Sequence, residues 1–433
     1  MSSAFIEINI FKFIFFQKNI RIKPLINQTT KFEIKQSQRG FSVRKFRLKI
    51  LLCLVLSAVI CGGVLIYTAS RIPDNYYVVK GEDVKLDTVY PVTTTVTDVK
   101  DDRYSLDVKF LGVIPVKKVN VRVVEDTSVI VGGEAFGVKF YTDGVIVVGM
   151  SDVTGEQRTV NPAFEAGIRV GDVIKSVNGE KITSNEDLSE IVEKSNGKAL
   201  KIDVVRQSLE YSVNVIAEKE KSSGQYKLGL WVRDSAAGIG TITYFDPVNK
   251  TFAGLGHSIC DADTGEIMPL AAADVVGVDI TSVKKSEKGV PGEIRGTFND
   301  SFFIGSLYSN VEEGVYGNLT ENFNFGGDEP VEIVFKQDVY EGPAKIRCCV
   351  DGTTVREYDI VIENVNRSST QKTKNMIIKV TDTQLLEITG GIVQGMSGSP
   401  ILQDGKLVGA VTHVLINSPT EGYGIFIENM LVN

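Results

Sequence analysis

Histidine is nearly absent from this chain of 433 residues, which contains only His257 and His413. The sequence has no H-E-x-x-H and no G-x-x-x-x-G-K-[ST] motif, so zinc-protease and P-loop nucleotide-binding functions have no support. Five cysteines without a C-x-x-C pair do not make a disulfide framework in a chain of this length. We therefore expect no metal and no cofactor, and any histidine chemistry has two candidate residues.

Net positive charge is confined to the N-terminal part of the chain. Residues 1–49 hold eleven Lys or Arg against two acids, a net of +9, which leaves −16 for residues 50–433 of the total of −7. An acidic body of this kind is not expected to bind nucleic acid. The chain is 43% hydrophobic with 41 Gly against 12 Pro, which indicates a globular, mainly β protein of two or three domains.

An apolar stretch of eighteen residues without a charge covers residues 50–67 and is just long enough to cross a bilayer. A basic cluster at 44–49 precedes it, and the positive-inside rule keeps that side in the cytoplasm. We expect a cytoplasmic basic segment at 1–47, a transmembrane signal-anchor helix at 48–69, and the later domains outside the cytoplasm. Translation from Val43 would leave only a short basic start before the apolar run.

Residues 70–128 form a small β-rich region before the larger domains. Apolar and polar residues alternate over 105–110 and 118–124, which predicts short strands. The segment 91–103 is polar, and exposed polar segments are preferred sites of proteolysis. We therefore expect 70–128 to be a linker region that contains self-cleavage sites.

Residues 129–218 carry the pattern P-A-x-x-A-G-x-x-x-G-D-x-I-x-x-V-N-G from Pro162, followed by a capped helix over 184–192. The pattern resembles a PDZ domain. Such domains bind an extended peptide, often a C-terminus, by adding it as a strand to a sheet edge. The resemblance implies that Phe136, Gly137 and Val138 present backbone N–H groups to the carboxylate of the peptide.

A serine segment near the C-terminus has the chemistry of a nucleophile. In Gly395-Met-Ser397-Gly-Ser-Pro the serine stands in a tight turn among small residues. The N–H groups of Gly395 and Ser397 can then converge on one point and form an oxyanion hole. An ordinary glycine-rich turn between strands is the alternative.

The residues after this segment strengthen the first interpretation. From Ser397 to His413 the sequence resembles chymotrypsin-like serine proteases, and Asp404-Gly405 is a hairpin signal within it. The resemblance implies a double β-barrel peptidase domain over 219–433. It also places Thr412 and His413 on the strand that flanks the substrate.

Catalysis by serine requires a base, and His257 stands after Gly256 at the end of an expected strand. A neutral imidazole there can take the serine proton and return it to the leaving amine. His413 is the rival, although the substrate-flanking strand makes it a pocket-wall residue. For the orienting acid, Asp300 and Asp382 both lie between the histidine and the serine in sequence, and spacing does not choose between them.

The sequence contains two longer motifs in addition to the signal-anchor and the PDZ block. G-H-S-x-x-D-x-D-T-G begins at Gly256, and G-G-I-V-Q-G-M-S-G-S-P begins at Gly390. Together they resemble the stage IV sporulation protein B (SpoIVB) peptidases over about residues 70–433. The resemblance implies that Asp382 is the catalytic acid beside His257 and Ser397.

The same resemblance implies a function and partners. Family members are self-cleaving serine endopeptidases exported into the space between the two membranes around the forespore. They cleave a membrane-bound regulator of an intramembrane metalloprotease, which leads to activation of a late mother-cell sigma factor. The PDZ block would hold the chain's own N-terminal region or the tail of a partner.

Two other functions remain open at this point. One is an envelope quality-control protease of the HtrA kind, in which the protease domain precedes the PDZ domain. The other is an inactive membrane-anchored PDZ scaffold, which the intact His257 and Ser397 segments oppose.

Overall fold

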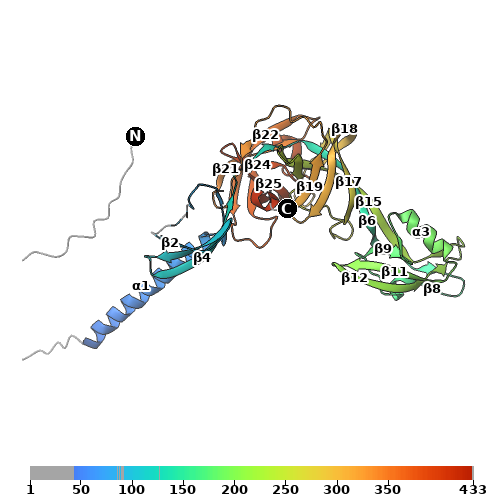
Figure 1. Ribbon diagram of the computed structural model, residues 1–433, viewed down its shortest axis with the longest axis horizontal. Helices are drawn as coiled ribbons and strands as arrows, with labels where there is room; N and C mark the ends of the chain where they lie inside the picture. The colour runs from blue at the N-terminus through green and yellow to red at the C-terminus, as the bar shows by residue number, and fades with distance from the viewer. Residues whose placement is uncertain (1–42, 85, 87, 89–91, 126, 432–433) are drawn as a thin grey trace, which may run out of the picture. The chain divides into compact units, whose positions relative to one another are not determined.

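The computed structural model describes residues 43–431 except 85, 87, 89–91 and 126 (Figure 1). Strands make up most of the described elements, which confirms the mainly β class. Most of the expected cytoplasmic segment, residues 1–42, lies outside the described residues.

Helix α1 (Val43–Arg71) contains the apolar run. Its span 49–70 has a mean hydropathy of 2.7 and is mostly exposed, with Thr68 near its end buried. At 1.5 Å per residue, the 22 residues of this span are long enough to cross the hydrocarbon core of a bilayer. The helix is therefore a candidate membrane span by length and composition, at the place that the sequence predicted.

A small sheet follows α1, with strand order β1-β4-β3-β2. Its strands are β1 (Asn75–Val79), β2 (Val92–Lys100), β3 (Arg103–Phe110) and β4 (Ile114–Val124). The expected strands at 105–110 and 118–124 both lie in it. The segment 91–103 is different from the expected linker, because most of it forms β2, an edge strand whose side chains are mainly exposed.

The first of two barrels begins directly after this sheet. Strands β6, β17, β18, β19, β16 and β15 pair in that order, and β15 pairs back with β6 to close the circuit. Their bounds are β6 (Ala135–Met150), β15 (Leu230–Asp246), β16 (Thr251–Gly254), β17 (Leu270–Lys284), β18 (Glu293–Val311) and β19 (Gly314–Leu319). Short strands β5 (Ser128–Val131) and β20 (Val331–Glu332) extend its edge. Buried aromatic residues such as Phe136, Phe140 and Phe252 fill the interior.

The second barrel is closed in the order β21-β22-β23-β26-β25-β24. Its strands are β21 (Gly342–Cys349), β22 (Val355–Val365), β23 (Met376–Val380), β24 (Pro400–Gln403), β25 (Lys406–Leu415) and β26 (Ser418–Phe426). Helix α4 (Thr383–Thr389) lies between β23 and β24, and α5 (Ile427–Leu431) ends the described chain. Asp404 and Gly405 both have positive φ, at 53° and 79°, which confirms the predicted hairpin turn between β24 and β25.

The PDZ block is inserted into the first barrel between β6 and β15. Its own elements are β7 (Val153–Thr154), β8 (Thr159–Val160), α2 (Pro162–Glu165), β9 (Val173–Val177), β10 (Glu180–Lys181), α3 (Asn185–Lys194), β11 (Ala199–Arg206), β12 (Leu209–Ile216), β13 (Glu218–Lys219) and β14 (Tyr226–Lys227). Ser184 and Asp187 form a reciprocal capping box, and Leu188 and Val192 of α3 are buried, as the helix signal predicted.

The two long strands β6 and β15 belong to both units. Residues 145–150 of β6 pair with 230–233 of β15 and with β9 in the PDZ block, whereas 135–141 pair with 235–241 in the barrel. The expected domain boundaries at 129 and 219 therefore do not separate the two structural units. A periodic strand pattern shows that a strand exists, but it does not show where along its length the pairing partner changes.

Candidate active site

Ser397 lies in the loop between α4 and β24, and the loop's own backbone holds its shape. The N–H of Met396 donates to the carbonyl of Val393 at 3.1 Å, and the N–H of Ser399 donates to that of Met396 at 2.9 Å. The Oγ of Ser397 donates to the carbonyl of Thr412 at 2.8 Å. Thr412 is on β25, the strand that the sequence predicted to flank the substrate.

Two buried threonines of β15 fasten this loop to the first barrel. The Oγ1 of Thr241 donates to the carbonyl of Gly395 at 2.8 Å, and its N–H donates to the carbonyl of Ser397 at 2.9 Å. The Oγ1 of Thr243 donates to the carbonyl of Gly398, also at 2.8 Å. Sequence reasoning missed both residues, although threonines two apart in a strand share one face.

Glycine is required where the two barrels approach each other. Gly398 has φ of +94°, and a Cβ there would lie 2.0 Å from the carbonyl oxygen of Thr241 and 2.4 Å from the nitrogen of Leu255. Both neighbours are backbone atoms, which cannot move aside as a flexible side chain would. The motif's glycine thus serves the contact between the barrels as well as the turn.

The predicted oxyanion donors are available. Met396, Gly398 and Ser399 all donate their N–H groups to carbonyls, but in the described part of the chain the N–H groups of Gly395 and Ser397 have no hydrogen-bond partner. Free N–H groups at the serine itself and two residues before it are what stabilisation of a tetrahedral oxyanion needs.

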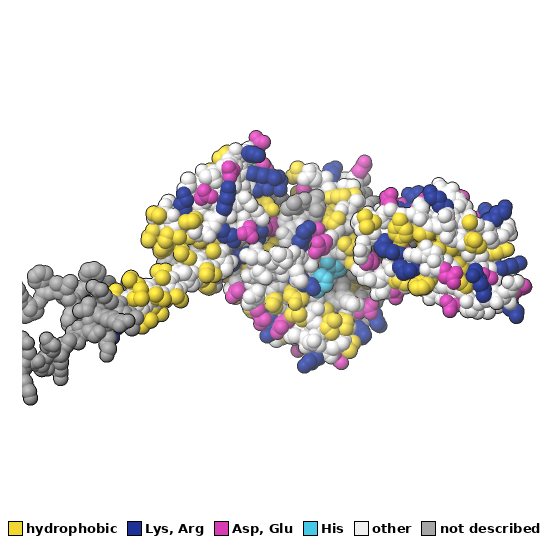
Figure 2. Space-filling view, turned by 90° about the horizontal axis from the view of Figure 1, so that it is seen from below, with side chains coloured by type: hydrophobic (Ala, Val, Ile, Leu, Met, Phe, Trp, Pro, Cys, Tyr) yellow, Lys and Arg dark blue, Asp and Glu magenta, His cyan; other side chains and the backbone are white. Residues whose placement is uncertain are grey.

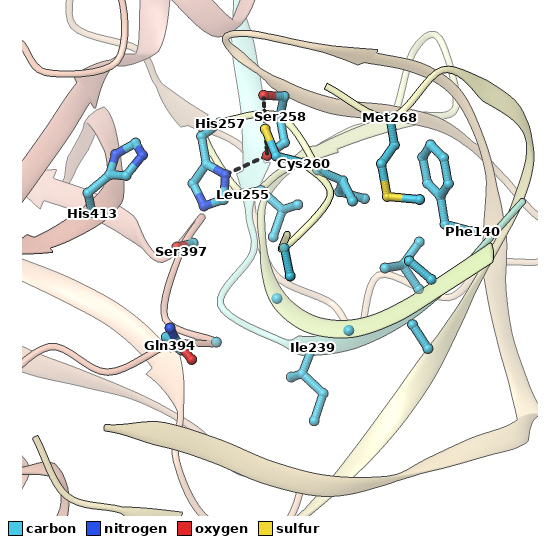
Figure 3. Close-up of a pocket in the computed structure, with 18 of the residues that line it drawn as sticks. Phe140, Ile239, Leu255, His257, Ser258, Cys260, Met268, Gln394, Ser397 and His413 are labelled. Carbon is cyan, nitrogen blue, oxygen red and sulfur yellow. Dashed lines mark hydrogen bonds between the residues drawn. The ribbon is translucent and has the colours of Figure 1, made fainter. Parts of the chain in front are cut away.

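His257 follows β16 and lines the same cavity as Ser397 (Figure 3). Its Nδ1 is 2.8 Å from the carbonyl oxygen of Ser258. A carbonyl only accepts, so Nδ1 carries the proton and Nε2 of the neutral ring keeps its lone pair. Burial lowers the pKa of His257 below the ordinary histidine value, which keeps the ring neutral.

His413 is on β25, and its ring centroid lies 5.0 Å from that of His257. Burial, together with the charges of His257 and Lys374, lowers the pKa of His413 to about 4. Its Nδ1 is buried and has no hydrogen-bond partner among the described groups. The structure therefore brings both histidines to Ser397, and the cyan side chains in Figure 2 show that the site opens on one face.

The expected catalytic acid does not reach His257 in this structure. Asp382 is the N-cap of α4, where its Oδ1 accepts from the N–H of Leu385 at 2.9 Å and its Oδ2 from the N–H of Asp359 at 3.4 Å. Asp300 instead pairs with Lys139 at 2.7 Å. Burial lowers the pKa of His257, the hydrogen bond to the Ser258 carbonyl opposes this shift, and no described carboxylate contributes to it.

The expected peptide-binding residues are also placed differently. Phe136, Gly137 and Val138 lie on β6, where they pair with β15 on one side and β17 on the other. All their sheet positions are thus occupied inside the first barrel. Phe136 and Val138 line the cavity that contains Ser397, so they belong to the peptidase unit and not to a PDZ groove.

The cavity has a volume of about 720 Å³. On one side it is lined by the serine loop and β25, and on the other by apolar residues of the first barrel: Phe136, Val138, Phe140, Ile239, Leu255 and Met268. Figure 3 shows His257 and Ser397 on one side of the cavity, with Met268 and Phe140 on the other.

Comparison with protein families gives two matches. Residues 224–431 match the SpoIVB peptidase S55 family, and residues 161–206 match a PDZ domain. The first match begins within the last residues of the inserted block, just before β14, and β5 and β6 of the same barrel precede it.

A putative zinc metalloprotease, LL2128, of Lactococcus lactis is 29% identical over 129 residues. The match spans 30% of this chain and 28% of that protein, so this chain covers less than a third of the length of that relative.

Solved structures give weaker likenesses. The PDZ domain of an SdrC-like protein from Listeria monocytogenes is 19% identical, covering 21% of this chain and 87% of that one, with a TM-score of 0.18. Deg5 is 14% identical, covering 45% and 80%, with a TM-score of 0.27. The active form of the Rv3671c protease from M. tuberculosis is 11% identical, covering 45% and 72%, with a TM-score of 0.25.

Proposed function

We propose that this chain, whose residues 224–431 form a serine peptidase domain of the SpoIVB S55 family, is a membrane-anchored, self-cleaving endopeptidase of sporulation signalling. Its substrate would be a membrane-bound regulator of an intramembrane metalloprotease, whose cleavage leads to activation of a late mother-cell sigma factor. The observation that carries the catalytic part is the placement of Ser397 and His257 in one cavity with two free N–H groups beside the serine.

The reaction begins when the Ser397 hydroxyl turns from the Thr412 carbonyl toward Nε2 of His257. Nε2 takes the hydroxyl proton while Oγ attacks the scissile carbonyl carbon. The resulting oxyanion accepts hydrogen bonds from the N–H groups of Gly395 and Ser397. His257 then gives its proton to the leaving amine as the peptide C–N bond breaks, and water hydrolyses the acyl-enzyme by the same steps.

The Ser258 carbonyl performs the orienting task that the sequence assigned to Asp382. It holds the Nδ1 proton of His257 and so fixes the tautomer that exposes the Nε2 lone pair. A neutral carbonyl stabilises the imidazolium less than a carboxylate does. We therefore expect proton transfer from Ser397 to His257 to be slower than in a full Ser-His-Asp triad.

The peptide-binding edge of the PDZ domain is the first part of β15. Residues 230–233 pair with β6 on one side, and within the described ranges no strand pairs with their other side. Helix α3 lies close to this stretch, since the N–H of Asn185 donates to Oδ2 of Asp234 at 2.9 Å. An open strand edge beside a helix is the geometry that accepts an extended peptide, either the chain's own N-terminal region or a partner's tail.

Strand β2 is the favoured region for self-cleavage. It is an exposed sheet edge in extended conformation, and its pairing with β3 is interrupted between Thr97 and Lys100. Serine peptidases bind substrate in extended form, so a cut here needs little local unfolding. Cleavage would break the covalent link between α1 and the two barrels. Release of a soluble peptidase from the outer face of the membrane then requires β1 to leave its pairing with β4.

The first test compares the wild-type full chain with Ser397→Ala in membranes. We expect the wild type to be labelled by a fluorophosphonate and to yield a shorter soluble form that begins within residues 70–125. The alanine variant should do neither while keeping its fold, as judged by circular dichroism. Shortening of a clean Ser397→Ala preparation would contradict self-cleavage, and absence of labelling in the wild type would favour the inactive scaffold.

The same preparation separates signalling from quality control. Ready turnover of casein by the wild type would favour the broad HtrA-like function. A protease restricted to the regulator should leave casein intact under conditions in which fluorophosphonate labels it.

A further inference from the structure

Arg233 on β15 holds the loop that follows His257. Its guanidinium forms an ion pair through Nη1 with Asp261 and through Nη2 with Asp263, the latter at 2.7 Å. Both aspartates belong to the G-H-S-x-x-D-x-D-T-G motif, in which the mechanism above uses only His257 and the Ser258 carbonyl. The two aspartates lie four and six residues after the base and have no part in the mechanism as described so far.

The Asp261 carboxylate organises the whole turn. Its side chain is fully buried, and its Oδ1 accepts hydrogen bonds from the N–H groups of Asp263 and Thr264 at 3.1 and 2.9 Å and from the Thr264 hydroxyl at 3.1 Å. A buried carboxylate with no cation would carry a large desolvation penalty. The Arg233 guanidinium supplies that cation, and these contacts together hold the pKa of Asp261 below its usual value.

The turn is the tip of a hairpin in which Cys260 pairs with Ile267, and the hairpin extends back to Ile259 beside Ser258. The N–H of Ile259 donates to Oδ1 of Asn310 at 2.7 Å, and the carbonyl of Ile259 accepts from the N–H of Met268 at 3.0 Å. Ser258, whose carbonyl holds the His257 tautomer, lies between this anchored residue and the base. A shift of the turn at Asp261 would therefore move the Ser258 carbonyl and rotate the imidazole.

The other end of this connection lies in the PDZ domain. Leu230 and Val232, on either side of Trp231 in β15, pack against the buried core of the PDZ block. Arg233 follows immediately and points to the catalytic loop, and beyond it 235–240 line the cavity. One strand thus joins the PDZ core, the His257 loop and, through Thr241, the Ser397 loop.

We propose that Arg233 is a positioning residue, which acts through Asp261 and the Ser258 carbonyl to hold His257 in its reactive orientation. The proposal rests on the proposed function of Ser397 and His257. It adds that the PDZ domain and the general base are mechanically joined by one ion-paired residue of β15.

The test uses Arg233→Gln and Asp261→Asn in the full chain, with Arg158→Gln as matched control, because Arg158 pairs with Glu218 inside the PDZ block at 3.1 Å. A misplacement of the base by about 1 Å costs roughly 100-fold in rate. We expect kcat to fall by about that factor in both variants with KM nearly unchanged. The double variant should be no slower than either single one, because the two residues act as a unit. The control should behave as wild type.

Two further readouts separate positioning from a general loss of stability. Loosening the turn admits water to His257, so the midpoint of the pH profile of kcat should rise toward the ordinary histidine value in Arg233→Gln. Arg233→Lys retains a charge without the fork that reaches both aspartates, and it should recover part of kcat.

The outcomes distinguish this inference from the proposed function. A wild type that is not labelled by fluorophosphonate overturns the proposed function. A labelled wild type together with a folded Arg233→Gln variant of unchanged kcat and pH midpoint overturns the role of Arg233. If Arg233→Gln does not fold, Arg233→Lys decides, because unchanged kcat and pH midpoint in that variant overturn the role as well.

Discussion

The PDZ block and the catalytic site are built in opposite ways. The buried core of the PDZ block uses residues from one stretch of chain, Val145 to Leu228. The catalytic site combines stretches at 235–243 and 254–261 in the first barrel with stretches at 392–398 and 412–416 in the second. The PDZ fold is therefore supported by local sequence, whereas the peptidase site exists only when both barrels are packed together.

Because of this difference, adding a single methyl group should have a small effect in the PDZ block and a large effect at the catalytic site. Gly179 in the PDZ block and Gly398 in the serine loop both have positive φ, at 83° and 94°. A Cβ at Gly179 would meet no atom within 4 Å, while one at Gly398 would overlap two backbone atoms of the other barrel. Substitution of glycine by alanine thus tests a local turn at position 179 and the interface between the two barrels at position 398.

The largest effect is expected for Gly398→Ala. Overlap with the Thr241 carbonyl forces the serine loop away from β15, which should cost at least about 3 kcal/mol of stability and more than about 100-fold in activity. Gly179→Ala has only the strain of its backbone conformation, roughly 1–2 kcal/mol. Thermal unfolding and fluorophosphonate labelling measure the two effects, and equal losses in both variants would refute the contrast.

A smaller effect concerns pH. The base must be neutral, and burial lowers the pKa of His257, so activity should persist below the ordinary histidine range and fall only as pH drops through a midpoint below 6.5. A carboxylate beside the imidazole would raise the pKa and move the midpoint above 6.5 instead. The profile of kcat/KM against pH reports this value for the free enzyme.

The pH experiment has its own control in His413→Gln. That variant removes the second imidazole, whose pKa of about 4 lies outside the range of interest. The pH profile of kcat/KM should therefore keep the midpoint that we assign to His257. Loss of this midpoint would show that His413 is the base.

The smallest effect is expected for Asp382→Asn. Asparagine caps a helix as well as aspartate does, so neither stability nor activity should change much, whereas Asp382→Ala should cost about 1 kcal/mol of stability. If Asp382 were the orienting acid, the asparagine variant would lose about 10⁴-fold in kcat, as substitution of a triad aspartate does. Comparing kcat and melting temperature of the two variants separates a cap from a catalytic acid.

Much of the local structure could be predicted from the sequence. The Ser184 capping box, the Asp404-Gly405 hairpin and the apolar helix all depend on residues within a few positions of one another. The tight turn at Ser397 is of the same kind, because its small neighbours determine the conformation of the backbone. Such signals survive in a single sequence because the interactions that produce them are local.

Three expectations depended on distant partners, and there the structure differs. The pattern at Phe136-Gly137-Val138 fits a PDZ loop as well as a barrel strand, and only pairing with β15 and β17 decides between them. The family resemblance implied that Asp382 is the catalytic acid, yet its carboxylate caps the N-terminus of α4. The domain boundaries failed because β6 and β15 change partners along their length.

The sequence alone determined the class of the protein, the span-length apolar helix, the tight turn at Ser397 and the two candidate histidines. The tertiary structure decided which strands close each barrel, that the PDZ block interrupts the first one, and that a backbone carbonyl instead of Asp382 faces the base. Local preferences arise from contacts between neighbours in the chain. The partner of a strand edge or of an imidazole nitrogen is chosen by the packing of residues more than a hundred positions apart, as for Thr241 and Gly395.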